Sequence, residues 1–147
     1  GRMEFDMARR QFEALREHYP DRAVLLEHLY QLAKLRPDLP DYRKYTRKLM
    51  NESLTRRQPE RTIEVWAEYM KLGEGHAPLD PEDHNRVLFT CLRNDDLKSA
   101  ERAFERLRSA GDKSLADEAC RLLAEEFDKR EITPKARHYR QLLSASG

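Results

Sequence analysis

The stretch HNRVLFTCLRNDDLKSAERAFERL, residues 84–107, decides the fold of this chain. Its packing residues lie 3, 4 and 7 positions after the first one and, beyond the polar break NDD, 16, 20 and 23 positions after it. They are His84, Val87, Leu88, Cys91, Ala100, Phe104 and Leu107. Spacings of three and four place side chains on one face of an α-helix. The stretch therefore predicts two antiparallel helices that are joined by a short turn and pack together.

The same spacing occurs elsewhere in the chain. Counted from Cys120 it gives Leu123, Ala124, Phe127, Ala136, Arg140 and Leu143, and counted from Leu26 it gives Leu29, Tyr30, Ala33, Tyr42, Thr46 and Leu49. The stretch ARRQFEALREHYPD, residues 8–21, fits as a second helix alone, with Ala8, Phe12 and Leu15. His84 and Cys120 are 36 positions apart, and Ala8 and Tyr42 are 34 apart. A helix pair that recurs at such a distance predicts an array of stacked pairs with a shared core.

The helix expected over 59–72 departs from this pattern. Its Ile63, Trp66, Ala67 and Met70 have the spacing of a first helix, but the continuation at Leu79, Asp83 and Arg86 fails. We therefore expect a first array over 3–56, a linking helix and loop over 57–80, and a second array over 81–145, within one continuous structural domain. Looser packing is expected where Tyr30 and Tyr42 replace small residues, and where Thr46 and Arg140 replace large apolar ones.

Eight helices are predicted, and proline marks the start of several of them. Pro40, Pro59, Pro81 and Pro134 precede amphipathic runs, as is typical of the first helical turn. Ser114 and Asp117 resemble a capping box. The predicted ranges are 4–18, 22–35, 40–56, 59–72, 81–93, 96–110, 114–129 and 134–145. The predicted fold class is all-α, a short α-solenoid of antiparallel helix pairs.

The repeat of about 34 residues, with a small residue at the helix crossing and Pro20 at the turn, resembles the tetratricopeptide repeat. Two longer phrases, residues 8–50 and DLKSAERAFERL with ARHYRQLL, look like the soluble tetratricopeptide tail of some bacterial rhomboid-family membrane proteins. That resemblance implies the cytoplasmic tail of an intramembrane serine protease homologue, tethered to the inner membrane by a region before Met3. The family's catalytic Ser and His lie in transmembrane helices, so no catalytic residue carries over.

A second repeat family is an alternative. The phrases DHNRVLFTCLRNDDLKSAERAFERLRSAG and REITPKARHYRQLL also resemble the pentatricopeptide repeat, which implies RNA binding with Asn85 at a base-reading position. Against it, residues 115–129 form a complete first helix, where that family would have a shortened unit. The chain has 28 Lys and Arg against 27 Asp and Glu, and its net charge of +1 gives no electrostatic argument for nucleic acid.

The residue patterns of catalysis are missing from the sequence. There is no Gly-rich phosphate loop and no nucleophile elbow. Separately, the sequence has no apolar run long enough to span a membrane. Cys91 and Cys120 are expected to be buried in a protein of a reducing compartment. The histidines lack metal-ligand spacing: His18, His28, His76, His84 and His138. We therefore predict a non-catalytic chain without cofactor or metal, whose partner is a protein or peptide segment.

The residues of the first helices that are not used in packing are candidates for binding that partner. They are Glu27, Gln31, Lys34, Asn85, Phe89, Arg93, Arg121 and Glu125. Phe89 is either an anchor for a partner or part of the seam between the arrays. The charged members are alternatively a solvated face. The basic runs RKYTRKLM, residues 43–50, and TRRQPER, residues 55–61, either rest on anionic lipid or are solvated beside Glu52 and Glu60.

Overall fold

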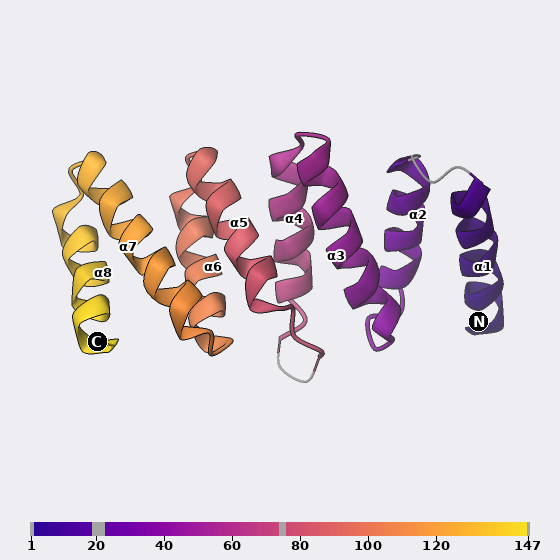
Figure 1. Ribbon diagram of the computed structural model, residues 1–147. Helices are drawn as coiled ribbons and strands as arrows, with labels where there is room; N and C mark the ends of the chain where they lie inside the picture. The colour runs from indigo at the N-terminus through magenta and orange to yellow at the C-terminus, as the bar shows by residue number, and fades with distance from the viewer. Residues whose placement is uncertain (1, 19–22, 74–75, 147) are drawn as a thin grey trace. The chain divides into compact units, whose positions relative to one another are not determined.

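A computed structural model describes residues 2–18, 23–73 and 76–146, with the backbone alone at 15–18 and 146. The described part is all-α and confirms the predicted fold class (Figure 1). Its helices are α1 (Arg2–His18), α2 (Ala23–Lys34), α3 (Pro40–Thr55), α4 (Pro59–Met70), α5 (Pro81–Arg93), α6 (Leu97–Ser109), α7 (Lys113–Lys129) and α8 (Thr133–Ser146). Every predicted helix is present, with ends within two residues of those expected. The side chains of Leu15 and His18 lie outside the described residues.

The helix starts follow the expected chemistry, with one exception. Pro40, Pro59 and Pro81 are the first residues of their helices. The backbone N–H of Asp80 donates to the carboxylate of Asp83 at 2.9 Å, which closes a capping box at α5. At α7 the expected cap is wrong: Asp112, not Ser114, accepts the N–H of Leu115, at 3.1 Å, because the helix begins one residue earlier.

The chain divides into two compact units, Gly1–Pro78 and Leu79–Gly147. The first contains α1 to α4 and the second contains α5 to α8. Consecutive helices pack against each other within each unit, and α4 packs against α3. The division therefore differs from the expected arrays, because the helix expected to link them is a packed member of the first unit. None of the helices in the described part is both long enough and apolar enough to cross a membrane.

Three helix pairs, α3–α4, α5–α6 and α7–α8, have the same turn. Arg57, Asp95 and Glu131 have positive φ angles of 57°, 58° and 59°. In each turn the following N–H reaches back to a carbonyl five residues earlier, from Gln58 to Ser53 at 2.8 Å, from Asp96 to Cys91 at 2.9 Å and from Ile132 to Phe127 at 2.8 Å. This is the Schellman arrangement of a helix C-terminus. The repeating unit of the structure is therefore a hairpin whose two helices are joined by this turn.

The hairpin α3–α4 is a copy of the repeat that the sequence reading did not identify. Counted from Thr46, the packing positions are Leu49, Met50, Ser53, Thr62, Trp66 and Tyr69, and all of these residues are buried. Together with Thr46 these make seven packing residues, and the three polar ones, Thr46, Ser53 and Thr62, hid the apolar pattern of the repeat. Inside the core, Ser53 and Thr62 share a hydrogen bond of 2.6 Å, which replaces the apolar contact expected between the two helices.

A shift of 74 positions relates α2, α3 and α4 of the first unit to α6, α7 and α8 of the second. Leu26 corresponds to Ala100, Thr46 to Cys120 and Thr62 to Ala136. Each unit also has an ion pair between the corresponding helices. Arg61 pairs with Glu27 at 2.7 Å in the first unit, and Lys135 pairs with Glu101 at 3.0 Å in the second. We conclude that α2 is a second helix of the repeat and corresponds to α6.

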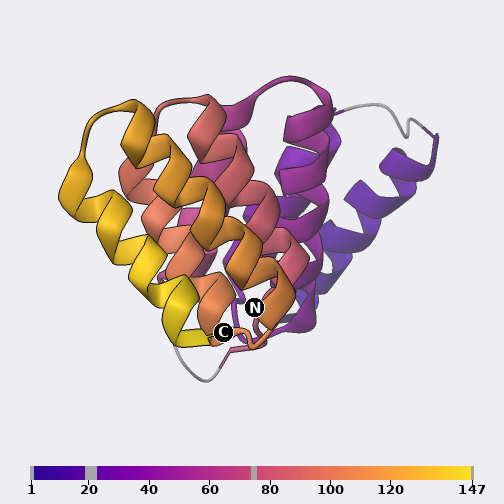
Figure 2. The same ribbon diagram turned by 60° about the vertical axis from the view of Figure 1, so that its left-hand side comes forward.

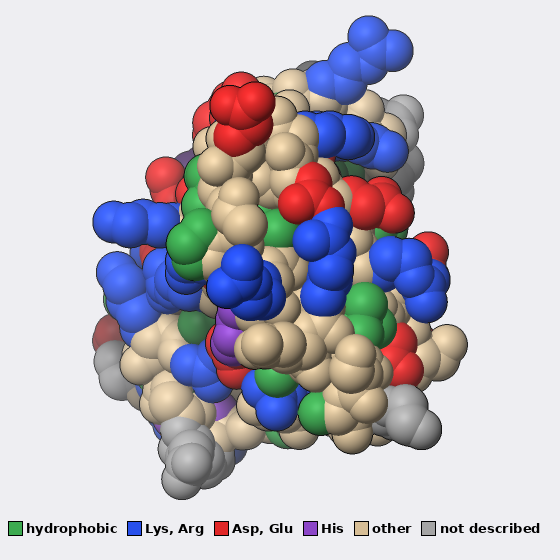
Figure 3. Space-filling model, turned by 90° about the vertical axis from the view of Figure 1, so that its left-hand side faces the viewer, with side chains coloured by type: hydrophobic (Ala, Val, Ile, Leu, Met, Phe, Trp, Pro, Cys, Tyr) green, Lys and Arg blue, Asp and Glu red, His purple; other side chains and the backbone are tan. Residues whose placement is uncertain are grey.

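The bulky and polar substitutions in the repeat have different outcomes. Tyr30 and Tyr42, which were expected to loosen the first array, are buried with ring centroids 5.9 Å apart. Arg140 occupies the position of the repeat at which the other two hairpins have the buried residues Phe104 and Trp66. Its side chain is 56% exposed and pairs with Asp128. Figure 2 shows α7 running beside α8, and Figure 3, seen from their side, shows many charged side chains and scattered hydrophobic ones. The outer side of this pair is thus mainly polar.

Candidate functional site

The predicted partner residues of the second unit lie on α5 and α7, which contact each other. Asn85 and Phe89 are half-buried, whereas Arg93 is exposed. The positions on α7 that correspond to Asn85 and Phe89 are Arg121 and Glu125, and both are exposed. Phe89 is thus partly within the packing of the unit and offers only part of its ring to a partner.

The predicted partner residues of the first unit have a different position from the one expected. They lie on α2, which corresponds to α6 and is a second helix of the repeat, whereas α5 and α7 are first helices. Glu27 accepts two hydrogen bonds from Arg61, at 2.9 and 2.7 Å. Lys34 donates to Glu68 at 2.8 Å. Of the three, Gln31 alone is classed as exposed, and Glu27 and Lys34 are half-buried. Glu27 and Lys34 therefore hold α2 against α4.

The basic runs are also engaged within the first unit. Arg43 donates to the backbone oxygen of Pro78 at 2.8 Å, and Arg56 pairs with Glu52 at 2.8 Å. Lys44 and Lys48 lie over the ring of Tyr45, 5.1 and 5.8 Å from its centroid. These contacts account for much of the positive charge in the two runs.

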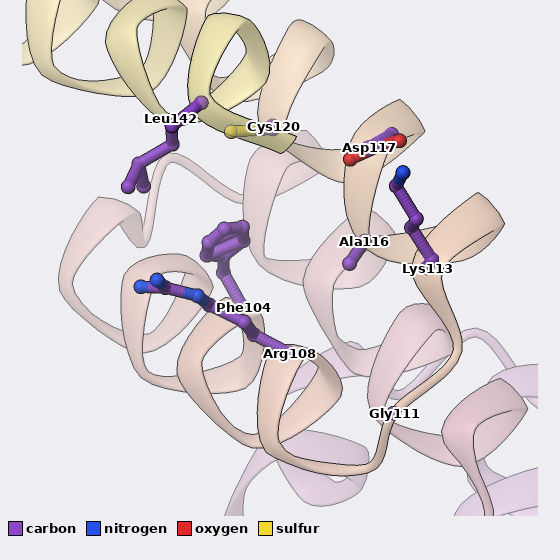
Figure 4. A pocket seen from close by; sticks show the side chains of 9 residues that line it. Phe104, Arg108, Gly111, Lys113, Ala116, Asp117, Cys120 and Leu142 are labelled. Carbon is purple, nitrogen blue, oxygen red and sulfur yellow. The ribbon is translucent and has the colours of Figure 1, made fainter. Parts of the chain in front are cut away.

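The second unit contains a pocket between α6, α7 and α8, which the sequence reading did not predict (Figure 4). Its volume is about 290 Å³. The lining comes from α6, from the turn after it, from the first half of α7 and from the end of α8. These residues are Phe104, Arg108, Gly111, Lys113, Ala116, Asp117, Cys120, Leu142 and Ala145. Figure 4 shows the ring of Phe104 at the centre, with Leu142 and Cys120 above it.

Charged groups lie around this apolar interior. Arg108 extends below Phe104, and Lys113 is directed toward Asp117 on the other side (Figure 4). Arg108 is exposed, and no ion pair of it is found among the described residues. An apolar wall with a few charged groups at its edge is the usual composition of a ligand site.

The corresponding region of the first unit explains why the pocket exists. Ala116 corresponds to Tyr42, whose ring centroid lies 5.9 Å from that of Tyr30 and 5.2 Å from that of Tyr69. Tyr30 in turn corresponds to Phe104. The first unit therefore places a buried phenol ring where the second unit has only the methyl group of Ala116.

Among the side chains that the structure describes, the thiols and imidazoles do not form a reactive cluster. Cys120 donates from Sγ to the backbone oxygen of Tyr139 at 3.1 Å. Burial raises the pKa of Cys120, and it raises that of Cys91 to about 12, so both thiols stay protonated at neutral pH. His84 is buried and His28 stacks on Phe12 at 5.1 Å. Across the described residues, no group of three or more His, Cys, Asp and Glu is placed to hold a metal ion.

The pocket had one signal in the sequence, the exchange of Tyr42 for Ala116 at equivalent positions. That signal can be seen only once the 74-position shift is known, and the polar residues Thr46, Ser53 and Thr62 at packing positions hid that shift in the sequence.

Comparisons of this chain with protein-family models, with curated proteins and with solved structures found no match.

Proposed function

We propose that this chain is a non-catalytic module that binds a segment of another protein, and that the second unit carries the binding site. One observation supports this proposal above the others: the second unit has an open pocket with an apolar wall and charged groups at its edge, whereas the corresponding region of the first unit holds a buried tyrosine. Arrays of helix pairs bind partners through side chains that rigid helices hold in place.

Capture of partners with and without nuclease tests this function. Immobilised protein should retain a protein from a lysate after nuclease treatment, and the purified partner should slow deuterium exchange of backbone amides in α6, α7 and α8. Loss of the retained material on nuclease treatment, with binding that falls steeply as salt rises, would favour the RNA-binding alternative, because phosphate contacts give that salt dependence. Retention of no protein at all would refute the proposal.

We propose further that the module belongs to a bacterial membrane protein of the rhomboid family and lies on its cytoplasmic side. The support is the resemblance of residues 8–50 and of the phrases around α6 and α8 to the soluble tails of such proteins. The reading frame upstream of Met3 tests this setting. It should encode about six apolar segments, each of roughly 20 residues.

A further inference from the structure

We infer that the pocket between α6, α7 and α8 binds an aromatic side chain that is followed by an acidic residue in a peptide segment of the partner. This inference rests on the proposed function and names the chemistry of the segment. It derives from the comparison of the two units, because the first unit contains both groups that the second one lacks.

The first missing group is a ring. In the first unit Tyr42 of α3 is buried, and its ring lies close to those of Tyr30 and Tyr69. In the second unit Phe104 keeps the aromatic position of Tyr30, but Ala116 stands in place of Tyr42. An apolar cavity of about 150 Å³ accepts a benzene ring in other proteins. The pocket, at about 290 Å³, has room for the ring of a Phe or Tyr side chain.

The second missing group is a carboxylate. In the first unit Glu68 of α4 accepts hydrogen bonds from Lys34 at 2.8 Å and from Tyr30 at 3.1 Å. The shift of 74 positions makes Arg108 the counterpart of Lys34 and Leu142 the counterpart of Glu68. The second unit therefore keeps the cation and has an apolar residue where its carboxylate would be.

A peptide with an aromatic and an acidic residue supplies both groups together. Its ring would lie against Phe104, Ala116 and Leu142, and its carboxylate would reach Arg108 at the edge of the pocket. Asp117 also lines the pocket and repels an anion. Figure 4 shows that Lys113 is directed toward Asp117, on the opposite side of the pocket from the end of the Arg108 side chain. This separation leaves the Arg108 side as the one that suits a carboxylate.

Titration with short peptides, followed by amide chemical shifts of the full chain, tests the inference. The first peptide has a central Phe-Glu pair and blocked ends. The second replaces Glu by Gln, the third replaces Phe by Ala, and the fourth ends on Phe with a free carboxylate. The first should bind two- to about fivefold more tightly than the second and at least about tenfold more tightly than the third, with shifts in α6, α7 and α8.

Two variants and a control locate the binding site. Ala116→Tyr places a ring in the pocket and should abolish binding of the Phe-Glu peptide. Lys129→Tyr adds the same ring at an exposed position near the other end of α7 and should leave binding unchanged. Arg108→Gln changes an exposed side chain, so the fold should persist. It should reduce binding of the Phe-Glu peptide to the level of the Phe-Gln peptide without altering the latter.

Several outcomes would overturn the inference. One is equal binding of the Phe-Glu and Phe-Gln peptides, and another is binding of the Phe-Glu peptide that survives Ala116→Tyr in a folded variant. The third is tighter binding of the peptide that ends on Phe, which would assign the site to a chain terminus. These outcomes leave the proposed function intact if a protein partner is still retained after nuclease treatment. Conversely, failure of the capture experiment does not affect the peptide titration.

Discussion

Ser53 on α3 and Thr62 on α4 share a hydrogen bond of 2.6 Å, and neither side chain is exposed to solvent. In the next hairpin the corresponding residues are Cys91 and Ala100, and in the last they are Phe127 and Ala136. The hairpin α3–α4 thus brings its helices together through a buried polar pair, whereas α5–α6 and α7–α8 use apolar or weakly polar side chains at the same positions. A buried polar pair is compatible with the core only while each group keeps a partner.

This pair should show coupling in a double-mutant cycle. Each of Ser53→Ala and Thr62→Ala removes one partner and should lower the free energy of unfolding by about 1 kcal/mol. The double variant should lose less than the sum of the single losses, since both single losses include the one hydrogen bond that the two side chains share. In each single variant the remaining hydroxyl still has the carbonyl of Met50 within reach, at 3.0 Å from Ser53 and 3.4 Å from Thr62. Urea unfolding of the four proteins measures the coupling. Strict additivity would show that the two hydroxyls do not depend on each other.

Thr46 offers a stabilising substitution. Its side chain is 0% exposed, and within the described residues its Oγ1 has no hydrogen-bond partner. Thr46→Val keeps the shape and removes a buried hydroxyl, so the free energy of unfolding should rise by about 1 kcal/mol. Thr55→Val is the control, because Thr55 is exposed and donates to Asn51 O at 3.0 Å. A loss of stability in the Thr46 variant would contradict the assignment.

The left-handed turn residue Arg57 predicts a second stabilising change. With φ at 57°, a side chain at this position is strained, and glycine adopts such a conformation freely. Arg57→Gly should raise the free energy of unfolding by about 0.5–1 kcal/mol. The neighbouring Arg56, with φ at −86°, provides the matched control. Arg56→Gly should be neutral or destabilising in thermal unfolding, and the same effect in both variants would refute the strain argument.

His84 should make stability depend on pH. Burial lowers the pKa of this imidazole, with smaller opposing effects from Asp83 and Asp80. The unfolded chain then binds the proton more readily, so the free energy of unfolding should fall as the pH drops below about 6.5 and level off below the folded pKa. His84→Gln removes this contribution while keeping the other histidines. Unfolding of both proteins from about pH 8 to 5 should give curves that converge toward low pH, and parallel curves would contradict the prediction.

The two equivalent ion pairs should differ in strength. Arg61 reaches Glu27 with two hydrogen bonds and its side chain is 22% exposed, whereas Lys135 reaches Glu101 with one and is 50% exposed. A forked and partly shielded pair is stronger than a single exposed one. Arg61→Gln should therefore cost about 1 kcal/mol, and Lys135→Gln less than about 0.5 kcal/mol. The reverse order in urea unfolding, or equal costs, would refute this assignment.

The helices could be predicted because their signals are local. Pro40, Pro59 and Pro81 fix where helices begin, and apolar residues at spacings of three and four fix which face is buried. The correspondence between α2 and α6 could not be read in the same way. It became visible only in the Glu27–Arg61 and Glu101–Lys135 pairs, which join helices that are separated in sequence by a third helix.

The sequence by itself determined the secondary structure and the all-α class, since hydrophobic periodicity and helix caps act over a few residues. The tertiary structure decided which helices correspond, which polar residues are buried and where a pocket remains. Whether Ala116 leaves a space depends on Phe104, Leu142 and Ala145, which three helices bring together. Such a space depends on how side chains from distant positions fill a shared volume, and no local pattern of residues contains that information.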